Sequence, residues 1–298
     1  MPRIGFVANL GPPGDPDIRA WTQALIAGLG DHGYLVGQNL QMDTRFPSDA
    51  SQNAEMLGEM LGSGIDMLVT GGTAATVTAK QATSTVPIVG FFTDPVGQGL
   101  VQSLARPAGN VTGISLDGTE YVGKWLELLQ KIKPTLRRVG WLYNPDNPGH
   151  IANLERATTL AATSGLEIVP GENRAMADLD TAFEKVVTSG AEALIAAGYN
   201  SAEGTTHLAA RALSHKLISL GVNSSQAAEG LLLSYTPDYI AIYRRLAYYT
   251  DRILRSAKPA DLPVELPTTF GLVVNHSTAS ALGITIPDEV ALQVTSWI

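Results

Sequence analysis

The sequence predicts an α/β protein made of two doubly wound lobes, each built around a parallel sheet. Two observations predict this fold class. Short β-branched or leucine-rich runs alternate with amphipathic stretches of about three to five helical turns, which is the pattern of repeated β–α units. The pattern runs through twice in 298 residues, a length above that at which a single hydrophobic core stops growing. We therefore expect two lobes rather than one.

The first lobe is expected to hold five strands, most of which run into turns of glycine, asparagine, aspartate or serine. The apolar runs lie at residues 4–9, 40–45, 65–70, 87–92 and 111–115. Amphipathic helices are expected between them at 17–32, 50–61 and 74–82. Gly33 and Gly62 follow the first two helices, and glycine is the residue that most often ends a helix.

The second lobe repeats this alternation before the chain crosses back. Strands are expected at 138–143, 166–169, 193–197, 217–222 and 230–235, with helices at 120–132, 148–164, 179–189 and 202–215. The tail adds a long helix from Pro237 to Arg255, a strand at 269–275, a helix from Ser277 and a short apolar end at 286–297. With crossings near Leu116, Tyr235 and Pro263, the expected lobes are residues 1–116 plus 236–262 and residues 117–235 plus 263–298.

The charge balance argues against a nucleic-acid partner. Lys and Arg total 20 against 28 Asp and Glu, which gives a net charge of −8, and no basic run occurs. The chain has no cysteine, which excludes disulfides, thiolate catalysis and cysteine-bound metals. Its five histidines are scattered without an i, i+4 pair, and no Walker A, GxSxG or GxGxxG pattern is found. We expect neither a metal nor any other cofactor.

The residues alone do not determine the cellular compartment of the protein. Met1, Pro2 and Arg3 lead straight into the first strand, without the basic region, apolar core and cleavage site of a signal peptide. No apolar run approaches the roughly 20 residues that cross a bilayer. The expectation is therefore either a cytosolic protein or one whose leader has been removed.

The segment from Val69 to Ser115 contains the strongest indication of a binding site. Its first apolar run ends in Gly71-Gly72-Thr73 and turns at once into a helix, whose free backbone N–H groups can hold an anion without a charged side chain. The second run ends at Thr93-Asp94. In a parallel sheet both strand ends open on the same carboxyl edge, where open α/β sheets hold their ligands. We therefore predict a small-molecule site.

Other polar and aromatic residues at strand ends admit two interpretations. Asp94 and Asp146 could form an acid–base pair across a cleft, but beside prolines they are more typical of turns. Tyr143, Tyr199 and Tyr235 lie where strands leave the sheet, and each could stack on a ligand ring or belong to the core. Four further tyrosines share one long helix, with a spacing that favours lobe packing: Tyr239, Tyr243, Tyr248 and Tyr249.

Several segments, in order along the chain, resemble one family. The most specific is the block from Thr93-Asp94-Pro95-Val96-Gly97 through Leu104-Ala105-Arg106-Pro107 to Gly109-Asn110-Val111-Thr112-Gly113. Further matches are Gly33-Tyr34 with Gly37-Gln38-Asn39-Leu40, Gly72-Thr73-Ala74-Ala75, Tyr143-Asn144-Pro145, Gly230-Leu231-Leu232 with Pro237-Asp238-Tyr239, and Lys258-Pro259-Ala260-Asp261-Leu262-Pro263. Together they span nearly the whole chain, which resembles the solute-binding proteins of bacterial ABC importers, in the branch whose members often bind aromatic amino acids.

The resemblance implies a type I periplasmic-binding fold, in which two lobes joined by three crossings close on a small solute and deliver it to a membrane permease. The protein would then act outside the cytoplasm after loss of an export signal, as a monomer and without catalysis. By this likeness the N-terminal lobe holds the ligand carboxylate with residues from three strand ends: Asn9, Leu10, Gly72, Thr73, Ala74, Thr93 and Asp94. The C-terminal lobe contributes Tyr143, Asn144, Asn147, Tyr199, Asn200, Asn223 and Ser224.

The sequence departs from the family pattern at two places, and two other functions are considered beside solute binding. The loop at 223–229 has no acidic residue early on to pair a ligand ammonium, so the solute could be an aromatic or aliphatic acid instead of an amino acid. Gly198-Tyr199-Asn200 is bulkier than the small polar turn of the family. An enzyme of the racemase or isomerase kind could use the same cleft, with Asp94 as one acid–base group. A further alternative is the effector-sensing domain of a regulator, which shares the fold. This sequence shows no DNA-binding extension of the kind that such a regulator carries.

Overall fold

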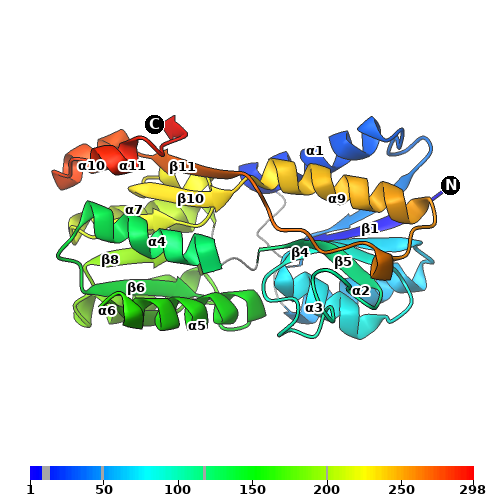
Figure 1. Cartoon of the computed structure of the whole chain (residues 1–298), viewed down its shortest axis with the longest axis horizontal. Helices are drawn as coiled ribbons and strands as arrows, with labels where there is room; N and C mark the ends of the chain where they lie inside the picture. The colour runs from blue at the N-terminus through cyan, green and yellow to red at the C-terminus, as the bar shows by residue number, and fades with distance from the viewer. Residues whose placement is uncertain (9–13, 48–49, 117–118, 199–200) are drawn as a thin grey trace. The chain divides into compact units, whose positions relative to one another are not determined.

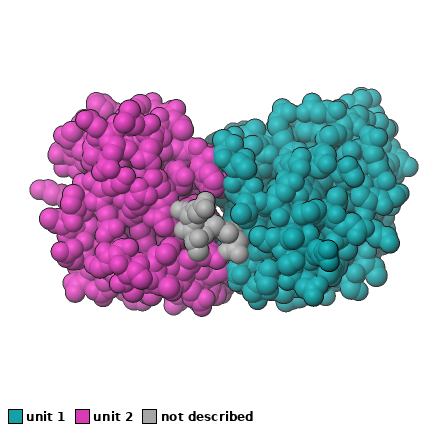
Figure 2. Space-filling model, in the orientation of Figure 1, with its two compact units in different colours: residues 1–117, 238–269 teal, residues 118–237, 270–298 magenta. Residues whose placement is uncertain are grey.

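The computed structural model describes residues 1–8, 14–47, 50–116, 119–198 and 201–298. The chain divides into two compact units, residues 1–117 with 238–269 and residues 118–237 with 270–298 (Figure 2). Each unit is a sheet covered by helices, so the expected fold class of two α/β lobes is confirmed. Within the described ranges, no helix combines the length and the apolar character that crossing a bilayer requires.

Unit 1 is built on a five-stranded sheet in the order β2-β1-β3-β4-β5, with all pairings parallel. Its strands are β1 (Arg3–Ala8), β2 (Gln41–Arg45), β3 (Met67–Gly71), β4 (Ile88–Phe92) and β5 (Val111–Ser115). The strands β3, β4 and β5 are buried along their whole length. Buried parallel strands are apolar on both faces, which explains their continuous apolar runs in the sequence.

Helices cover both faces of the unit 1 sheet (Figure 1). On one face, α1 (Pro16–Asp31) packs along α9 (Tyr239–Leu254), and on the other α2 (Ala50–Gly62) packs along α3 (Thr73–Ala82). The ring of Tyr243 stacks on Trp21 at 6.2 Å and meets Phe6 and Phe91 edge-on. Tyr239 lies 4.5 Å from the same tryptophan ring. These two tyrosines of α9 therefore serve packing inside unit 1.

A close contact between two glycines sets the spacing of β4 and β5. Gly113 has φ +141°, and a Cβ built on it would lie 1.8 Å from the carbonyl oxygen of Gly90. A Cβ on Gly90 would in turn lie 2.1 Å from the hydroxyl oxygen of Thr70. Gly113 requires both the backbone freedom and the missing side chain of glycine, whereas Gly90 requires only the missing side chain. The space left at Gly90 is filled by the Thr70 hydroxyl, which belongs to the site described below.

Unit 2 holds a seven-stranded sheet in the order β12-β11-β10-β9-β8-β6-β7. Its strands are β6 (Arg138–Tyr143), β7 (Glu167–Glu172), β8 (Ala193–Ala196), β9 (Ile218–Gly221), β10 (Leu233–Pro237), β11 (Phe270–Val274) and β12 (Ser296–Trp297). The sheet is parallel, as expected, except at one pairing, where β11 runs antiparallel to β10. After β10 the chain passes into unit 1, and it re-enters unit 2 as β11. No helix of unit 2 therefore connects these two strands, and neighbouring strands need a crossover connection to pair in parallel.

The helices of unit 2 also lie on two faces (Figure 1). They are α4 (Thr119–Ile132) with α5 (Pro148–Thr163), and α6 (Leu179–Thr188) with α7 (Ala202–Ser214). Buried Leu142, Phe183, Leu194 and Leu208 belong to one core that joins α6 and α7 to the sheet. The shorter elements are α8 (Ser225–Ala228), α10 (His276–Leu282), α11 (Asp288–Ala291) and 3₁₀ turns at Met176–Asp178 and Pro259–Asp261, the last in unit 1.

At the third crossing, the boundary between the two units lies at a different residue from the expected one. Residues 263–269 cluster with unit 1, because Ser115 donates its backbone N–H to the Glu265 carbonyl at 2.7 Å and the Glu265 N–H donates to the Gly113 carbonyl at 3.0 Å. Arg245 of α9 also donates to both carboxylate oxygens of Glu265, at 2.8 and 2.6 Å. Conversely, residues 236–237 belong to β10 and therefore to unit 2.

Candidate functional site

The amino end of α3 lies at the carboxyl edge of the unit 1 sheet, beside the end of β4. Gly72 precedes the helix with φ +96°, and no side chain caps the helix start. The Thr76 N–H bonds to the Gly72 carbonyl at 3.1 Å and opens the helical hydrogen-bond pattern. The N–H groups of Thr73 and Ala74 consequently have no acceptor within their own helix. A helix start of this kind attracts an anion.

Threonine hydroxyls tie this helix start to the strands beside it. The Thr93 backbone N–H donates to the Thr73 hydroxyl at 2.9 Å, and both residues are 5% exposed. The Thr76 hydroxyl donates to the Gly72 carbonyl at 2.9 Å, so the 2.7 Å contact between Thr70 and Thr76 has Thr70 as its donor. These bonds hold the start of α3 against β3 and β4. Its amide donors are therefore positioned before any ligand arrives.

Asp94 forms a turn directly after β4. Its backbone has φ +52°, its Oδ1 accepts the Gly97 N–H at 3.2 Å, and its carbonyl accepts the Gln98 N–H at 2.9 Å. A side chain that accepts from its own turn is typical of aspartate before proline. The turn interpretation of Asp94 is confirmed by these bonds, and one of its two carboxylate oxygens is committed to them.

Tyr143 ends β6 at the carboxyl edge of the unit 2 sheet. Its hydroxyl donates to Glu172 Oε1 at 3.3 Å, and Glu172 is its neighbour in register on β7. Burial and the negative charge of Glu172 both raise the pKa of the Tyr143 phenol. The tyrosine therefore stays protonated at neutral pH, with a half-buried ring and a hydroxyl engaged with the adjacent strand.

Asn144 and Asn147 shape the loop between β6 and α5. Asn144 Oδ1 accepts the Asp146 N–H at 2.8 Å, and Asn147 Oδ1 caps α5 by accepting the Gly149 N–H at 2.9 Å. The Asn144 backbone N–H donates to His150 Nδ1 at 3.2 Å. Burial lowers the pKa of His150 to about 4, so the ring is neutral and can accept this bond. The side-chain Oδ1 atoms of both asparagines are thus engaged in hydrogen bonds within the loop.

Asn223 and Ser224 follow β9, where a buried glutamine organises the turn. The Oε1 atom of Gln226 accepts the N–H groups of Val222 at 2.7 Å and of Asn223 at 2.9 Å. Gln226 is 1% exposed, and its Nε2 donates to the Ala196 carbonyl at 3.4 Å. The backbone of this turn is therefore stabilised by a neutral amide rather than by a carboxylate.

Within each unit, hydrogen bonds join some of the described residues of the predicted site in pairs. Thr73 bonds directly to Thr93, and the Asn147 N–H donates to the Asn144 carbonyl at 3.2 Å. In the unit 2 sheet, β8 separates β9 from β6, so the turn after β9 is not adjacent to the loop after β6. Four predicted residues lie outside the described residues: Asn9, Leu10, Tyr199 and Asn200.

Two polar residues at the unit 2 edge were not predicted from the sequence. His150 accepts a hydrogen bond from the Asn144 backbone N–H, and Asn173 follows β7 and is 1% exposed. The signal for Asn173 was available, since it is an asparagine directly after a strand. It was missed because Pro170 and Gly171 indicate a strand end near 169, whereas β7 runs through both to Glu172.

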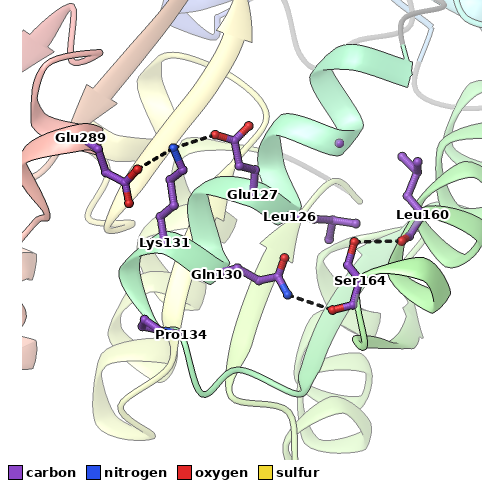
Figure 3. A pocket seen from close by; sticks show the side chains of 9 residues that line it. Leu126, Glu127, Gln130, Lys131, Pro134, Leu160, Ser164 and Glu289 are labelled. Atoms are coloured by element: carbon purple, nitrogen blue, oxygen red, sulfur yellow. Dashed lines mark hydrogen bonds and ion pairs between the residues drawn. The ribbon is translucent and has the colours of Figure 1, made fainter.

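A surface hollow of about 580 Å³ lies elsewhere in unit 2, between α4 and α5 (Figure 3). Leu126 and Leu160 contribute its apolar part, and Lys131 lies at its side, bonded to Glu127 at 3.0 Å and Glu289 at 2.9 Å. Its lining residues Pro134 and Ser164 lie in the segments that lead into β6 and β7, so the hollow lies toward the opposite end of the strands from the predicted site. Among the residues described, no group of three or more His, Asp or Glu side chains is arranged to hold a metal ion.

The chain is similar to known proteins of one family. The chain matches the model for ABC transporter substrate binding proteins over residues 14–298. It is 28% identical to a conserved domain protein from Vibrio cholerae, with a TM-score of 0.92 over 100% of this chain and 99% of that one. It is 25% identical to an ABC domain solved with L-Trp from Streptococcus pneumoniae, with a TM-score of 0.90 and the same coverage.

A tyrosine-binding protein from Clostridioides difficile is 23% identical over 272 residues, which are 90% of this chain and 77% of that protein. Nothing in these similarities supports the alternative of an acid–base enzyme. Substrate-binding proteins of ABC transporters work outside the cytoplasmic membrane and present a small ligand to a permease. Because the family match extends from residue 14 to the last residue, this chain belongs to the ABC transporter substrate-binding protein family.

Proposed function

We propose that this substrate-binding protein captures an aromatic amino acid and delivers it to its ABC permease. The observation that carries the proposal is the uncapped start of α3 at the carboxyl edge of unit 1. The N–H groups of Thr73 and Ala74 would each donate to the ligand carboxylate, and Gly72 lets the backbone approach it closely. Hydrogen bonds to an ionised acceptor are the strongest of their kind, so two of them suit a site that must retain its ligand.

Two similar proteins support the aromatic class. One is described as tyrosine-binding, and the other was solved with L-Trp. Both amino acids combine a carboxylate, an ammonium group and an aromatic ring. In this chain, we assign the carboxylate to unit 1 and the remainder of the ligand to Tyr143, Asn144, Asn147, Asn223 and Ser224 of unit 2. The carbonyl oxygens of Asn144 and Asn147 are engaged in their loop, so their amide nitrogens would face the ligand.

The finer features of this role are part of the same proposal. The protein would act in the periplasm or on the outer face of the membrane after removal of an export signal. It would act as a monomer, since each chain contains both sheets with their carboxyl edges. It would have no nucleic-acid partner, in keeping with a net charge of −8.

Calorimetry on ligand-free protein tests the proposal. The protein is unfolded to release any bound solute, refolded, and titrated with L-tyrosine, L-tryptophan, L-phenylalanine and L-leucine. Binding of at least one aromatic amino acid, with much weaker binding of leucine, is the expected result. Mass spectrometry of the solute released on unfolding identifies the ligand that the protein carries from the cell.

Two analogues separate the contributions of the ligand's charged groups. L-Tyrosine amide lacks the carboxylate and should bind much more weakly if α3 holds that group. The acid 3-(4-hydroxyphenyl)propionate lacks the ammonium, and tight binding of it would indicate an aromatic acid as the solute instead of an amino acid. Failure of every aromatic amino acid and aromatic acid to bind would contradict the proposed function.

A further inference from the structure

Asn173 has a buried side-chain amide at the carboxyl edge of unit 2, and this amide is unpaired within the described part of the chain. It directly follows β7, and its side chain is 1% exposed. Neither Oδ1 nor Nδ2 has a hydrogen-bond partner among the described residues. Its backbone N–H donates to the Tyr143 carbonyl at 2.9 Å, which holds the residue against the end of β6. The amide therefore lies at the same strand ends as Tyr143 and Asn144.

Gly198 leaves the space that this amide occupies. A Cβ built on Gly198, which follows β8, would lie 1.7 Å from Asn173 Oδ1 and 2.8 Å from Nδ2. Because β6 lies between β7 and β8 in the sheet, the side chain of Asn173 reaches across the end of β6 to the segment after β8. Any residue other than glycine at 198 would displace the amide. The pair therefore keeps one donor and one acceptor at a defined place on the edge.

An unpaired buried amide is unfavourable for folding. A buried polar group without a partner costs about 1–3 kcal/mol, and an apolar side chain of similar shape can be neutral or stabilising. A partner from outside the protein would remove this penalty when it binds. The partner that fits an amide with both atoms unpaired is a group that donates and accepts at once.

Among the groups of an aromatic amino acid, the phenol hydroxyl of tyrosine both donates and accepts a hydrogen bond. The ammonium and the indole N–H only donate, and the carboxylate only accepts. A water molecule held by the ligand has the same dual character. We propose that Asn173 is a further ligand-recognition residue, whose amide exchanges hydrogen bonds with the tyrosine hydroxyl or with a water that the ligand holds in place. This inference rests on the proposed function.

The test compares Asn173→Leu with Asn53→Leu. Asn53 is the matched control, because it is also fully buried with an unpaired Oδ1 but lies on α2 of unit 1, where it bonds to Thr78. Each variant is titrated with L-tyrosine and L-phenylalanine, and its unfolding is measured without ligand. For Asn173→Leu, we expect a ligand-free protein at least as stable as the wild type and an affinity for L-tyrosine about tenfold lower or worse. For Asn53→Leu, we expect an unchanged affinity.

Comparing L-tyrosine with L-phenylalanine shows whether the Asn173 amide bonds to the phenol hydroxyl or to a water held by the ligand. A loss confined to L-tyrosine assigns the phenol hydroxyl, and an equal loss for L-phenylalanine assigns the held water. Should Asn173→Leu not fold, Asn173→Ser and Gly198→Ala replace it, since the first shortens the group and the second displaces it. A folded Asn173 variant that binds both ligands as the wild type does would overturn the inference and leave the proposed function standing. A wild type that binds neither ligand would overturn the inference, and it would overturn the proposed function as well if L-tryptophan and the aromatic acid also fail to bind.

Discussion

The backbone N–H of Thr93 donates to the side-chain hydroxyl of Thr73 at 2.9 Å, which fastens the first residue of α3 to the end of β4. Both residues are almost completely buried, so solvent does not compete for this bond between the helix start and the strand end. The hydroxyl of Thr73 is thereby used for structure, while its backbone N–H remains for an anion. The two roles of one residue can be separated by substitution.

Thr73→Val and Thr73→Pro should differ in ligand affinity, although both lose the hydrogen bond to Thr93. Both variants lose the hydroxyl and leave the Thr93 N–H unpaired, at a cost of about 1–2 kcal/mol in unfolding free energy. Proline also fits the first position of a helix, but it removes the backbone N–H. We expect Thr73→Pro to bind the aromatic amino acid about tenfold more weakly than Thr73→Val, measured by calorimetry. Equal affinities would remove the helix start from the proposed site.

His150 should make the protein less stable as the pH falls. The folded protein holds this ring neutral with a pKa of about 4, whereas an unfolded histidine titrates near 6.5. Between these values the unfolded chain binds the extra proton, so stability is lost as the pH drops from about 7 toward 4, by up to about 3 kcal/mol. His150→Asn keeps an acceptor for the Asn144 N–H but has no charge to gain. Denaturant unfolding at pH 7.5 and 4.5 should show a smaller pH loss in this variant than in the wild type.

Gly113→Ala should destabilise unit 1 far more than Gly99→Ala. An alanine Cβ at 113 would overlap the Gly90 carbonyl, and φ +141° is unsuited to a side chain. We expect a loss of more than about 3 kcal/mol or failure to fold. Gly99 also has positive φ, at +66°, but its Cβ would meet no atom within 4 Å, so its loss should be about 1 kcal/mol. Similar melting temperatures for the two variants would contradict the steric argument.

The ion pair between Arg245 and Glu265 should contribute modestly to stability. The Arg245 guanidinium beside it lowers the pKa of the Glu265 carboxyl, so the contribution is present at neutral pH and is lost as the pH falls through that pKa. About two fifths of each side chain is exposed, so solvent screening limits Glu265→Gln to a loss of about 1 kcal/mol or less at pH 7. Glu59→Gln is the control, because the contact of Glu59 with Arg45 is longer, at 3.3 Å, and Glu59 is more exposed. Chemical unfolding at pH 7 and pH 3 should show the difference between the variants only at pH 7.

Most strands and helices could be predicted because the periodicity of apolar residues and the positions of turn residues indicate the same element boundaries. The run 111–115 and the run 138–143 coincide with β5 and β6, where apolar residues are bounded by polar ones on both sides. Pro237 misled the prediction of α9, since proline is common at a helix start but here ends β10. The helix begins at Tyr239 because Asp238 caps it by accepting the Ala241 N–H at 3.0 Å.

The candidate site was harder to predict because hydrogen-bond partners are set by tertiary structure. The sequence indicates that Asn144 and Asn147 follow a strand, but not that both carbonyl oxygens bond within their own loop. It cannot show that Thr73 and Thr93 are bonded, since 20 residues separate them. Asn173 could be identified only once β7 was seen to continue through a proline and a glycine.

The pairing of Glu265 with β5 has a consequence for solubility. In the order of the unit 1 sheet, β5 is terminal, and a terminal apolar strand offers unpaired backbone groups to other molecules. The passing segment occupies the Gly113 carbonyl and the Ser115 N–H, and it places a charge and the prolines Pro263 and Pro267 beside them. The connection that links the two units therefore also shields unit 1 against intermolecular strand addition, and cleavage of this segment would leave the protein prone to aggregate.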